Sequence, residues 1–519
     1  MVRVPVRIAA LCGVIFFGFT AVPAMADDAA ELLAKHKAFV GYSFLDGSIA
    51  SLVLDGTITN IKKSVPEVTN TVHEVHRGIA ERTTETDLGS KLDNSSGFTG
   101  SLYWEIQSPN GFINPVVGDR QKYSVAWDLL FNEATALMHA ELMGTKQLEG
   151  TSYPVVRLTA AAATAIDVYV DPKTGAYKRA VIDPGGPDED TLDILAYGDA
   201  GSGKHVISKF KRPESNYVHE WTKIMANVPV SNEALHPPVG TSPWKFGAGK
   251  PFPIQYKDGD YGRGIYISAT VNGVPGRFKL DTGAYSILLT QAFAQKAHVK
   301  HTGSTVAQGF GPKQVHPNLD LIGTFAVGDN VMTDVKTTSA DTDLGENTDG
   351  LLGFEFLAGA IVTLDLDNQQ MSLAAPNTPV DKSKGLNVLV DLAGGQPHVP
   401  MIMNGKTQVD ALLDSGDEFN VIFAKDLASK YGVSMMIDPD PNRYINSHIV
   451  VSGVGGNDVV ECGTLDALAL GPIVYQNTNA CTTTSMSGRD VNVGIDFLHN
   501  FNIVFDYPEA LLIMTPRKL

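Results

Sequence analysis

The chain has 519 residues, which is the length of roughly three ordinary domains. Hydrophobic residues make up 43% and charged residues 19%, and 50 Gly and 28 Pro argue against a long coiled coil, a collagen-like repeat or a highly charged disordered protein. The net charge of -17 opposes binding to nucleic acid phosphates and to anionic lipid, so we expect neither partner. This composition favours a turn-rich, mainly β protein.

The segment from Met1 to Ala26 has the pattern of a secretory signal peptide. Arg3 and Arg7 precede an apolar run from Ile8 to Ala21, and small residues precede a cleavage site after Ala26. A membrane anchor is the alternative, but the run is shorter than the ~20 apolar residues of a spanning helix. We therefore expect export to the periplasm or to the outside, with no stable membrane insertion.

Export changes the meaning of the cysteines. Three Cys in this length exclude a disulfide scaffold and a zinc site of four cysteines. Cys12 is removed with the signal peptide, and an oxidising compartment lets a disulfide persist. Cys462 and Cys481 are therefore candidates for one bridge, with two buried free thiols as the alternative.

Residues 27–235 are expected to form an α+β domain. Asp27–Val40 has an acidic start and an apolar stripe of helical spacing. The segments beyond it alternate apolar and polar residues, and Ile166–Ile182 is predicted to be a hairpin with its turn at Asp171–Gly175. We predict a helix on a curved antiparallel sheet, followed by a Pro/Gly-rich linker at residues 236–253.

Two patterns that could indicate ligand sites are better explained without one. Gly198–Lys204 has the spacing of a phosphate-binding loop, but His205 replaces the required Ser or Thr, so we expect an ordinary hairpin loop. Two histidine pairs lack a third metal ligand and are expected on solvated polar faces: His73 with His76, and His298 with His301. We predict no metal and no cofactor.

From residue 254 to the C-terminus the sequence repeats itself. Strand-like segments lead to Asp281-Thr282-Gly283 in one copy and to Asp414-Ser415-Gly416 in the other. Apolar segments that end in glycine follow in the same order, at Leu351-Leu352-Gly353 and at Asn492-Val493-Gly494. We predict two copies of one lobe, residues 254–376 and 386–519, joined by a linker at 377–385.

Two such motifs in register resemble the bilobal aspartic proteases of the pepsin and retropepsin type. The resemblance implies that each lobe contributes one catalytic residue, here Asp281 and Asp414, and that the substrate is a polypeptide. It also implies that Thr282 and Ser415 hold the opposite lobe. Gly283 and Gly416 would allow the tight turn and the approach of substrate. Two adjacent carboxyl groups share one proton and supply both the base and the acid of peptide hydrolysis.

Two residues of the second copy depart from the family pattern. Asn492 stands at an apolar position, and Asp417 stands where pepsins carry a Ser or Thr that supports the catalytic carboxylate. Asp417 and Glu418 could raise the pKa of the pair by like-charge repulsion, or could mark a degenerate second lobe. We favour an active pair because Asp-Ser-Gly is intact.

The family covers its substrate with β-hairpin flaps. Two glycine-rich segments lie at the expected place in each copy, Gly309-Phe310-Gly311 and Gly453-Val454-Gly455-Gly456. If both are flaps, the cleft closes from two sides, as in dimeric retropepsins, and Gly309, Gly311, Gly453 and Gly455 bind substrate. Ordinary surface hairpins are the alternative.

The N-terminal block resembles the half-barrel of periplasmic lipoprotein-carrier proteins in Leu33-Ala34-Lys35-His36 and in the hairpin Val170–Gly175. By analogy alone it could hold an apolar ligand, present substrate, or block the cleft as a pro-domain. We expect an exported, monomeric aspartic endopeptidase. The alternative is a non-catalytic periplasmic protein that binds or carries peptides or lipids on a degenerate protease scaffold.

Overall fold

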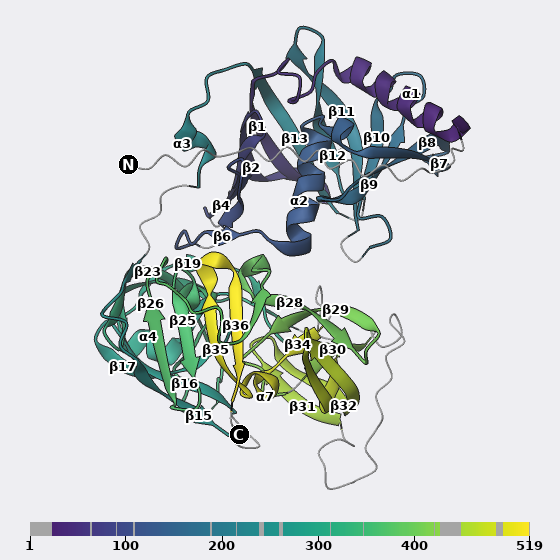
Figure 1. The fold of residues 1–519 in the computed structure, drawn as a ribbon. Coiled ribbons are helices and arrows are strands. Elements are labelled where there is room, and N and C mark those ends of the chain that lie inside the picture. Colours follow the sequence, from purple (N-terminus) through teal and green to yellow (C-terminus); the bar gives the residue numbers. More distant parts are fainter. Residues whose placement is uncertain are drawn as a thin grey trace, which may run out of the picture.

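The computed structural model shows an N-terminal and a C-terminal region that contact each other (Figure 1). The described residues are 23–62, 65–89, 91–106, 109–186, 189–213, 215–237, 243–258, 263–311, 313–345, 347–419, 421–425, 448–483 and 491–517. The predicted signal peptide lies outside the described residues as far as residue 22.

The N-terminal region is one curved antiparallel sheet with helices laid on it, which confirms the predicted architecture (Figure 1). The described strands form a 13-stranded sheet in the order β6-β5-β4-β3-β2-β1-β13-β12-β11-β10-β9-β8-β7. The strands are β1 (Ser51–Asn60), β2 (Glu67–Arg77), β3 (Ala80–Asp87), β4 (Asp93–Phe98), β5 (Tyr103–Ile106), β6 (Asn114–Pro115), β7 (His139–Leu148), β8 (Thr151–Ala160), β9 (Ala163–Val170), β10 (Tyr177–Ile182), β11 (Asp190–Gly201), β12 (Lys204–Lys211) and β13 (Tyr217–Ala226). The helices are α1 (Pro23–Val40), α2 (Gly118–Phe131), α3 (Asn232–Leu235) and the 3-10 turn η1 (Thr135–Leu137).

Alternation along the strands builds the core of this region. Ile166 and Val168 of β9, Tyr177 and Ile182 of β10, and Leu130 of α2 are fully buried in one cluster. Successive side chains of a strand point to opposite faces, so an apolar residue at every second position gives the sheet one buried face. The helices α1 and α2 cover that face.

Three expectations for this region have definite outcomes. The hairpin of β9 and β10 is confirmed. Gly198–Lys204 spans the end of β11 and the start of β12, so the hairpin loop is confirmed as well. The prediction for His76 is wrong: its side chain is buried between the carboxylates of Glu74 and Glu81, because Phe44 stacks on its ring.

Two lobes with the same order of elements form the C-terminal region, which confirms the predicted duplication. The first contains β15 (Phe252–Lys257), β16 (Gly264–Val271), β17 (Val274–Leu280), β18 (Ile287–Thr290), α4 (Gln291–Lys296), β19 (Lys300–Ser304), β20 (Ala307–Gln308), β21 (Gln314–Val315), β22 (Asn318–Val327), β23 (Asn330–Ala340), β24 (Gly350–Leu352), α5 (Phe354–Leu357), β25 (Ile361–Asp365) and β26 (Gln370–Ala374). The second contains β27 (Leu386–Leu389), η2 (Ala393–Gly395), β28 (His398–Met403), β29 (Thr407–Leu413), β30 (Val421–Ala424), β31 (His448–Gly453), β32 (Gly456–Leu470), β33 (Ile473–Thr483), β34 (Val491–Val493), α7 (Ile495–Leu498), β35 (Phe501–Asp506), η4 (Tyr507–Glu509) and β36 (Leu511–Pro516).

A sheet shared by both lobes determines how they face each other. The equivalent strands β25 and β35 pair in antiparallel register, from Ile361 opposite Asp506 to Leu364 opposite Ile503. Outward from this pair the order is β26-β15 on one side and β36-β27 on the other. Equivalent strands therefore meet at a pseudo-twofold axis, which places the two Asp turns in opposition.

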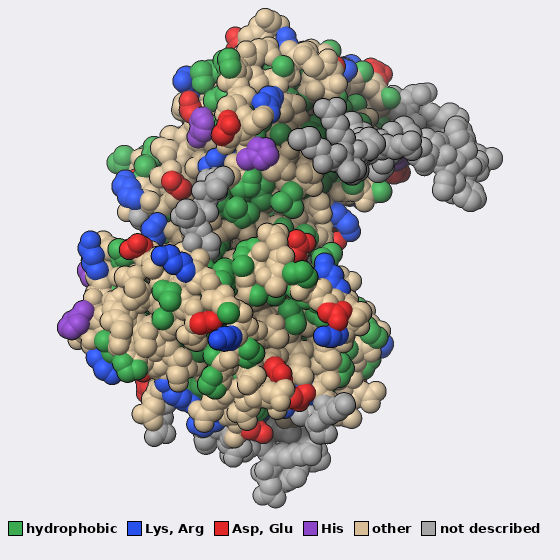
Figure 2. All heavy atoms as spheres, turned by 60° about the vertical axis from the view of Figure 1, so that its left-hand side comes forward, with side chains coloured by type: hydrophobic (Ala, Val, Ile, Leu, Met, Phe, Trp, Pro, Cys, Tyr) green, Lys and Arg blue, Asp and Glu red, His purple; other side chains and the backbone are tan. Residues whose placement is uncertain are grey.

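The segment that the sequence predicts to be a linker is partly built into the first lobe. Trp244 and Lys245 form β14 (Trp244–Lys245), which pairs with β23, and the Trp244 side chain is buried. Figure 2 shows acidic and basic side chains interspersed over one face of both regions. Within the described residues, every helix is too short or too polar to cross a lipid bilayer.

Candidate active site

The two Asp turns are joined by reciprocal hydrogen bonds. The Thr282 hydroxyl donates to the Leu413 carbonyl at 2.6 Å and accepts from the Ser415 backbone N–H at 2.9 Å. In return, the Ser415 hydroxyl donates to the Leu280 carbonyl at 3.0 Å and accepts from the Thr282 N–H at 3.1 Å. Both side chains are buried. These four bonds hold each turn against the strand that precedes the other.

Close approach at the turns requires glycine. A Cβ added at Gly283 would lie 2.4 Å from the Asp414 carboxyl carbon, and one at Gly416 would lie 2.4 Å from that of Asp281. The carboxyl groups of Asp281 and Asp414 therefore each lie against the other turn. Removal from water and the nearby carboxyl group of Asp414 raise the pKa of Asp281 well above the usual value of an aspartate.

The apolar segments that end in glycine thread beside the turns in both lobes. The Asp281 N–H donates to the Leu352 carbonyl at 3.0 Å, and the Asp414 N–H donates to the Val493 carbonyl at 2.9 Å. After the segment, Phe354 donates its N–H to the Ala284 carbonyl at 2.8 Å. The parallel pairs β17–β24 and β29–β34 produce these matching contacts.

The two departures in the second copy belong to one hydrogen-bonded unit. The Asn492 side-chain amide donates to Asp414 Oδ2 at 2.8 Å and lies 3.5 Å from Asp417 Oδ2. Asp414 also accepts from the Gly416 N–H at 2.9 Å. Removal from water and the charge of Asp414 raise the pKa of Asp417 well above its usual value. Asn492 thus stands where it can bridge two carboxyl groups, which an apolar residue could not do.

Lys279 is a site residue that the sequence reasoning missed. It precedes Asp281 by two residues, and it is 7% exposed. Its ammonium group donates to the Gly416 carbonyl at 3.0 Å and to Glu418 Oε1 at 3.3 Å. A lysine between the apolar residues Phe278 and Leu280 was the available signal, because a buried ammonium group needs a partner. The partner of Glu418 is therefore Lys279 of the other lobe.

The two predicted flap segments contact each other. The Gly455 N–H donates to the Phe310 carbonyl at 2.8 Å, and the Lys313 N–H donates to the Gly455 carbonyl at 3.0 Å. A Cβ added at Gly311, whose φ is +118°, would lie 2.4 Å from the Gly455 backbone. The structure thus brings together the tips that connect β20 to β21 and β31 to β32, with these glycines at the contact: Gly309, Gly311, Gly453 and Gly455.

A disulfide joins Cys462 of β32 to Cys481 of β33. The two residues lie opposite each other in the strand register, with their Cα atoms 4.0 Å apart. Phe310 and Phe419 pack against the small apolar cluster that contains Cys481. The flap tip of the first lobe therefore rests on the part of the second lobe that carries the disulfide.

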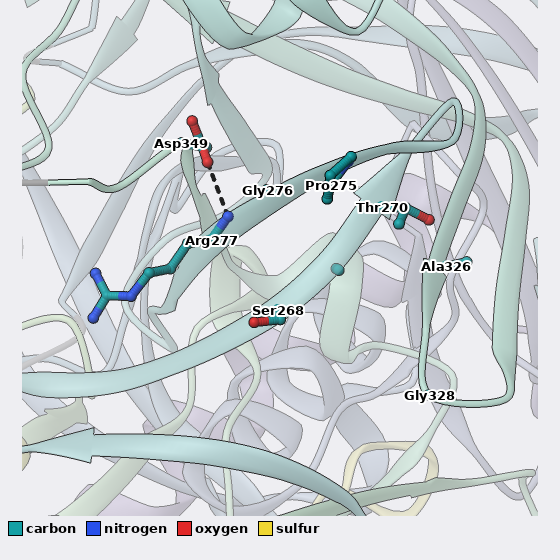
Figure 3. Close-up of a pocket in the computed structure, with 9 residues that line it drawn as sticks. Ser268, Thr270, Pro275, Gly276, Arg277, Ala326, Gly328 and Asp349 are labelled. Carbon is teal, nitrogen blue, oxygen red and sulfur yellow. Dashed lines mark hydrogen bonds between the residues drawn. The ribbon is translucent and has the colours of Figure 1, made fainter.

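Two cavities lie away from the paired Asp residues. One, of about 510 Å³, is lined by residues of β16, β17 and their neighbours, including Arg277 and Asp349 (Figure 3). There the Arg277 N–H donates to Asp349 Oδ2 at 2.9 Å. The other, of about 350 Å³, lies in the N-terminal region between α2 and β3 to β5. Over the described parts of the chain, no cluster of His, Cys, Asp and Glu is arranged to hold a metal ion.

Comparisons with known proteins follow the division of the chain. A family model described as aspartyl protease matches residues 267–356 and 399–497. No curated protein sequence matches the chain. The paired turns, their reciprocal hydrogen bonds and this match all concern the same two segments.

Solved structures cover a different part. A LolA superfamily protein from Nitrosomonas europaea is 13% identical with a TM-score of 0.30, and covers 40% of this chain and 97% of its own. A putative outer membrane lipoprotein-sorting protein domain from Vibrio parahaemolyticus is 9% identical with a TM-score of 0.29, over 40% and 97%. Both align with the N-terminal part. A DUF1329 family protein from Desulfovibrio piger is 10% identical with a TM-score of 0.30, over 42% and 99%. The two lobes of the C-terminal region resemble the aspartyl proteases, as their registered motifs predict.

Proposed function

We propose that the protein is an exported aspartic endopeptidase whose catalytic residues are Asp281 and Asp414. The reciprocal hydrogen bonds of Thr282 and Ser415 carry the proposal, because they hold the two Asp turns together with each carboxyl group against the other turn. Two carboxyl groups that share one proton can act at once as general base and general acid. The substrate class that this chemistry serves is a polypeptide.

The hydrogen bonds around the pair support a proton on Asp281 and a charge on Asp414. Two N–H groups, from Gly416 and Asn492, donate to Asp414, which favours its carboxylate form. Asp414 then takes a proton from water while the water oxygen attacks the peptide carbonyl carbon. Asp281 gives its proton to the carbonyl oxygen, so that a neutral gem-diol forms.

Breakdown of the gem-diol returns both residues to their starting state. Asp414, now protonated, donates to the peptide nitrogen, while Asp281 accepts a proton from one gem-diol hydroxyl. The carbon–nitrogen bond breaks, and a carboxylic acid and an amine leave. No electron transfer is involved, and every proton is returned.

The experiment compares single substitutions on the full-length protein. Asp281→Asn and Asp414→Asn should each abolish cleavage of an unfolded protein substrate while the thermal unfolding profile stays as in the wild type. Asp466→Asn, an exposed carboxylate on β32, is the matched control and should cleave normally. Retained cleavage in either first variant contradicts the shared pair.

One observation favours a second candidate, a non-catalytic peptide-binding protein. Asp417 and Asn492 depart from the protease pattern, and Asn492 donates a hydrogen bond to Asp414, the proposed base. In that case, a statine-type peptide inhibitor binds the wild type, Asp281→Asn and Asp414→Asn with equal affinity, and no peptide bond is cut. Calorimetric titration of the three proteins separates the candidates, because a protease should lose affinity for the inhibitor in both variants.

We also propose that the protein acts in the periplasm or outside the cell as a monomer. The disulfide between Cys462 and Cys481 supports an oxidising compartment. The signal-peptide pattern at the start of the sequence supports the same location. Mass spectrometry of the exported protein should give an N-terminus at Asp27, and recovery of uncleaved protein in the cytoplasm would contradict it.

A further inference from the structure

A loop of the N-terminal region reaches into the first lobe. Residues Pro109–Val117, which we name the docking loop, connect β5 to α2 and include the short strand β6. Figure 1 shows that the N-terminal region lies at the end of the C-terminal region that is opposite β31 and β32. The docking loop therefore meets the protease lobes far from the second flap.

The Asn110 side chain pairs with a strand of the first lobe as another strand would. Its Oδ1 accepts from the Lys336 N–H at 2.8 Å, and its Nδ2 donates to the Lys336 carbonyl at 2.9 Å. The same amide donates to the carboxylate of Glu355, which is fully buried in α5. The Lys336 ammonium group donates to the Pro109 carbonyl at 2.9 Å. Glu355 thus receives a donor from outside its own lobe.

Phe112 belongs to the core of the protease lobes rather than to that of its own region. Its side chain is 4% exposed, and its ring meets Phe354 edge to face with centroids 6.4 Å apart. Phe354 stacks on Tyr285 and donates its N–H to the Ala284 carbonyl. One aromatic side chain therefore separates Phe112 from the turn that begins at Asp281.

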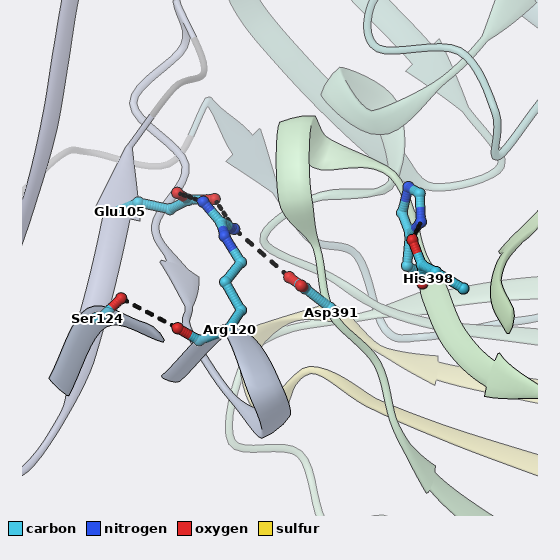
Figure 4. A network of polar contacts seen from close by, with 6 residues as sticks. Glu105, Arg120, Ser124, Asp391 and His398 are labelled. Carbon is cyan, nitrogen blue, oxygen red and sulfur yellow. Dashed lines mark hydrogen bonds and ion pairs between the residues drawn. The ribbon is translucent and has the colours of Figure 1, made fainter. Parts of the chain in front are cut away.

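An ion pair of the N-terminal region extends to the second lobe through Arg120, which lies between Glu105 and Asp391 (Figure 4). Arg120 of α2 holds Glu105 with an Nη1–Oε1 distance of 2.8 Å and lies 3.4 Å from Asp391 Oδ1. Asp391 forms a β-bridge with His398. Between them, Gln396 donates its side-chain amide to the Gly283 carbonyl. The segment held by Arg120 is therefore in direct contact with the first Asp turn.

The equivalent acid of the second lobe also receives its hydrogen-bond donor from outside its own lobe. Glu355 follows Gly353 at the same spacing at which Asp496 follows Gly494, so the two are equivalent acids of the two copies. Asp496 receives its donor from Arg263, which belongs to the first lobe. The second lobe is thus completed by the first, and the first lobe is completed by the N-terminal region.

We propose that the docking loop is a positioning element of the Asp281 turn, which makes the N-terminal region a permanent part of the enzyme rather than a removable pro-segment. Phe112 and Asn110 act as positioning residues for the Asp281 turn. Phe112 acts through Phe354 of α5, and Asn110 acts through Glu355 of α5. The inference rests on the proposed protease function for its kinetic readout only. Misplacement of a reacting group by about 1 Å can lower a rate about 100-fold, so a loop at this distance can control kcat.

The experiment uses full-length Phe112→Ala and Asn110→Ala, with Ile113→Ala as the matched control. Ile113 lies in the same loop but is 39% exposed. We expect the first two variants to lower kcat about tenfold or more, with KM within about twofold of the wild type. Ile113→Ala should match the wild type, and Phe112→Leu, which keeps apolar bulk, should restore most of kcat.

A second readout does not depend on activity. Hydrogen exchange at the Ala284 and Phe354 amides should accelerate in Phe112→Ala and Asn110→Ala at a temperature where both proteins stay folded, and not in Ile113→Ala. Unchanged exchange, or a loss of activity that only follows the unfolded fraction, overturns the proposal. If the wild type cleaves no peptide, the protease function fails while exchange still decides the role of the docking loop.

Discussion

The two lobes share one backbone plan but differ in the charges around it. Each has a strand, an Asp turn and an apolar-Gly segment, and each hydroxyl holds the other lobe through equivalent hydrogen bonds. At equivalent positions, however, the first lobe has Lys279 where the second has Leu412. The second has Asp417 and Asn492 where the first has Ala284 and Leu351, and Asn492 donates a hydrogen bond to Asp414.

This difference separates two requirements of a paired site. Symmetry of the backbone brings two like groups together, because the same contact is made twice across the axis. Asymmetry of the neighbours then decides which carboxyl group holds the proton, since two identical environments would leave it equally shared. Lys279, beside Asp281, and Asn492, which donates to Asp414, are two such unequal neighbours.

The largest effect should come from the two Asp residues taken together. We predict that Asp281→Asn and Asp414→Asn each lower kcat/KM for a fluorogenic peptide at least about 1,000-fold. The double variant should have a kcat/KM no lower than that of the less active single variant. The acid and the base act as one unit, so losing either disables both. A much larger loss in the double variant would mean that the lobes contribute independently.

The hydroxyl pair tests the symmetry of the backbone plan. Thr282→Ala and Ser415→Ala should each lower the free energy of unfolding, measured in urea, by about 1–3 kcal/mol, because each leaves buried backbone groups without partners. The two losses should be similar. Thr282→Ser and Ser415→Thr keep the hydroxyl and serve as controls, and a loss confined to one lobe would break the symmetry.

Lys279 tests the asymmetry of charge. Its ammonium group lowers the pKa of Asp281, partly offsetting the increase that burial and Asp414 cause. Lys279→Leu, which copies Leu412, should therefore move the alkaline limb of the kcat/KM profile upward by up to about one pH unit, because Asp281 stays protonated longer. Lys279→Arg keeps the charge and should leave the limb in place, whereas a downward shift in Lys279→Leu would refute this role.

Asp417 should have the smallest effect, seen in stability. Because its pKa is raised in the folded state, its stabilising contribution is fully present below the usual Asp value of about 3.8 and is lost as pH rises through the raised value. Asp417→Asn removes this loss, so the variant should gain stability over the wild type as pH increases from about 4 to 8. Urea unfolding across that range measures the difference in free energy of unfolding between the variant and the wild type. Asp466→Asn is the control and should show no change with pH. A difference for Asp417→Asn that does not change with pH would contradict a raised pKa of Asp417.

Much of the site could be predicted because duplication repeats a local pattern. Asp281 and Asp414 are two among 57 acidic residues, yet register alone separates them from the rest. Lys279 was not found, because its partner Glu418 is 139 residues away in the chain and no spacing rule links them. His76 was placed on the wrong face for the same reason, since Phe44 covers it from outside its strand.

By itself, the sequence determined the mainly β class, the two lobes and the paired Asp turns. These features depend on alternation, turn residues and a repeat, all of which are local or periodic. Only the tertiary structure decided that Asn492 bridges two carboxyl groups and that Asn110 and Phe112 complete the first lobe. Asn110 and Lys336 are 226 residues apart, and contacts at such separations follow from packing, which leaves no period in the sequence.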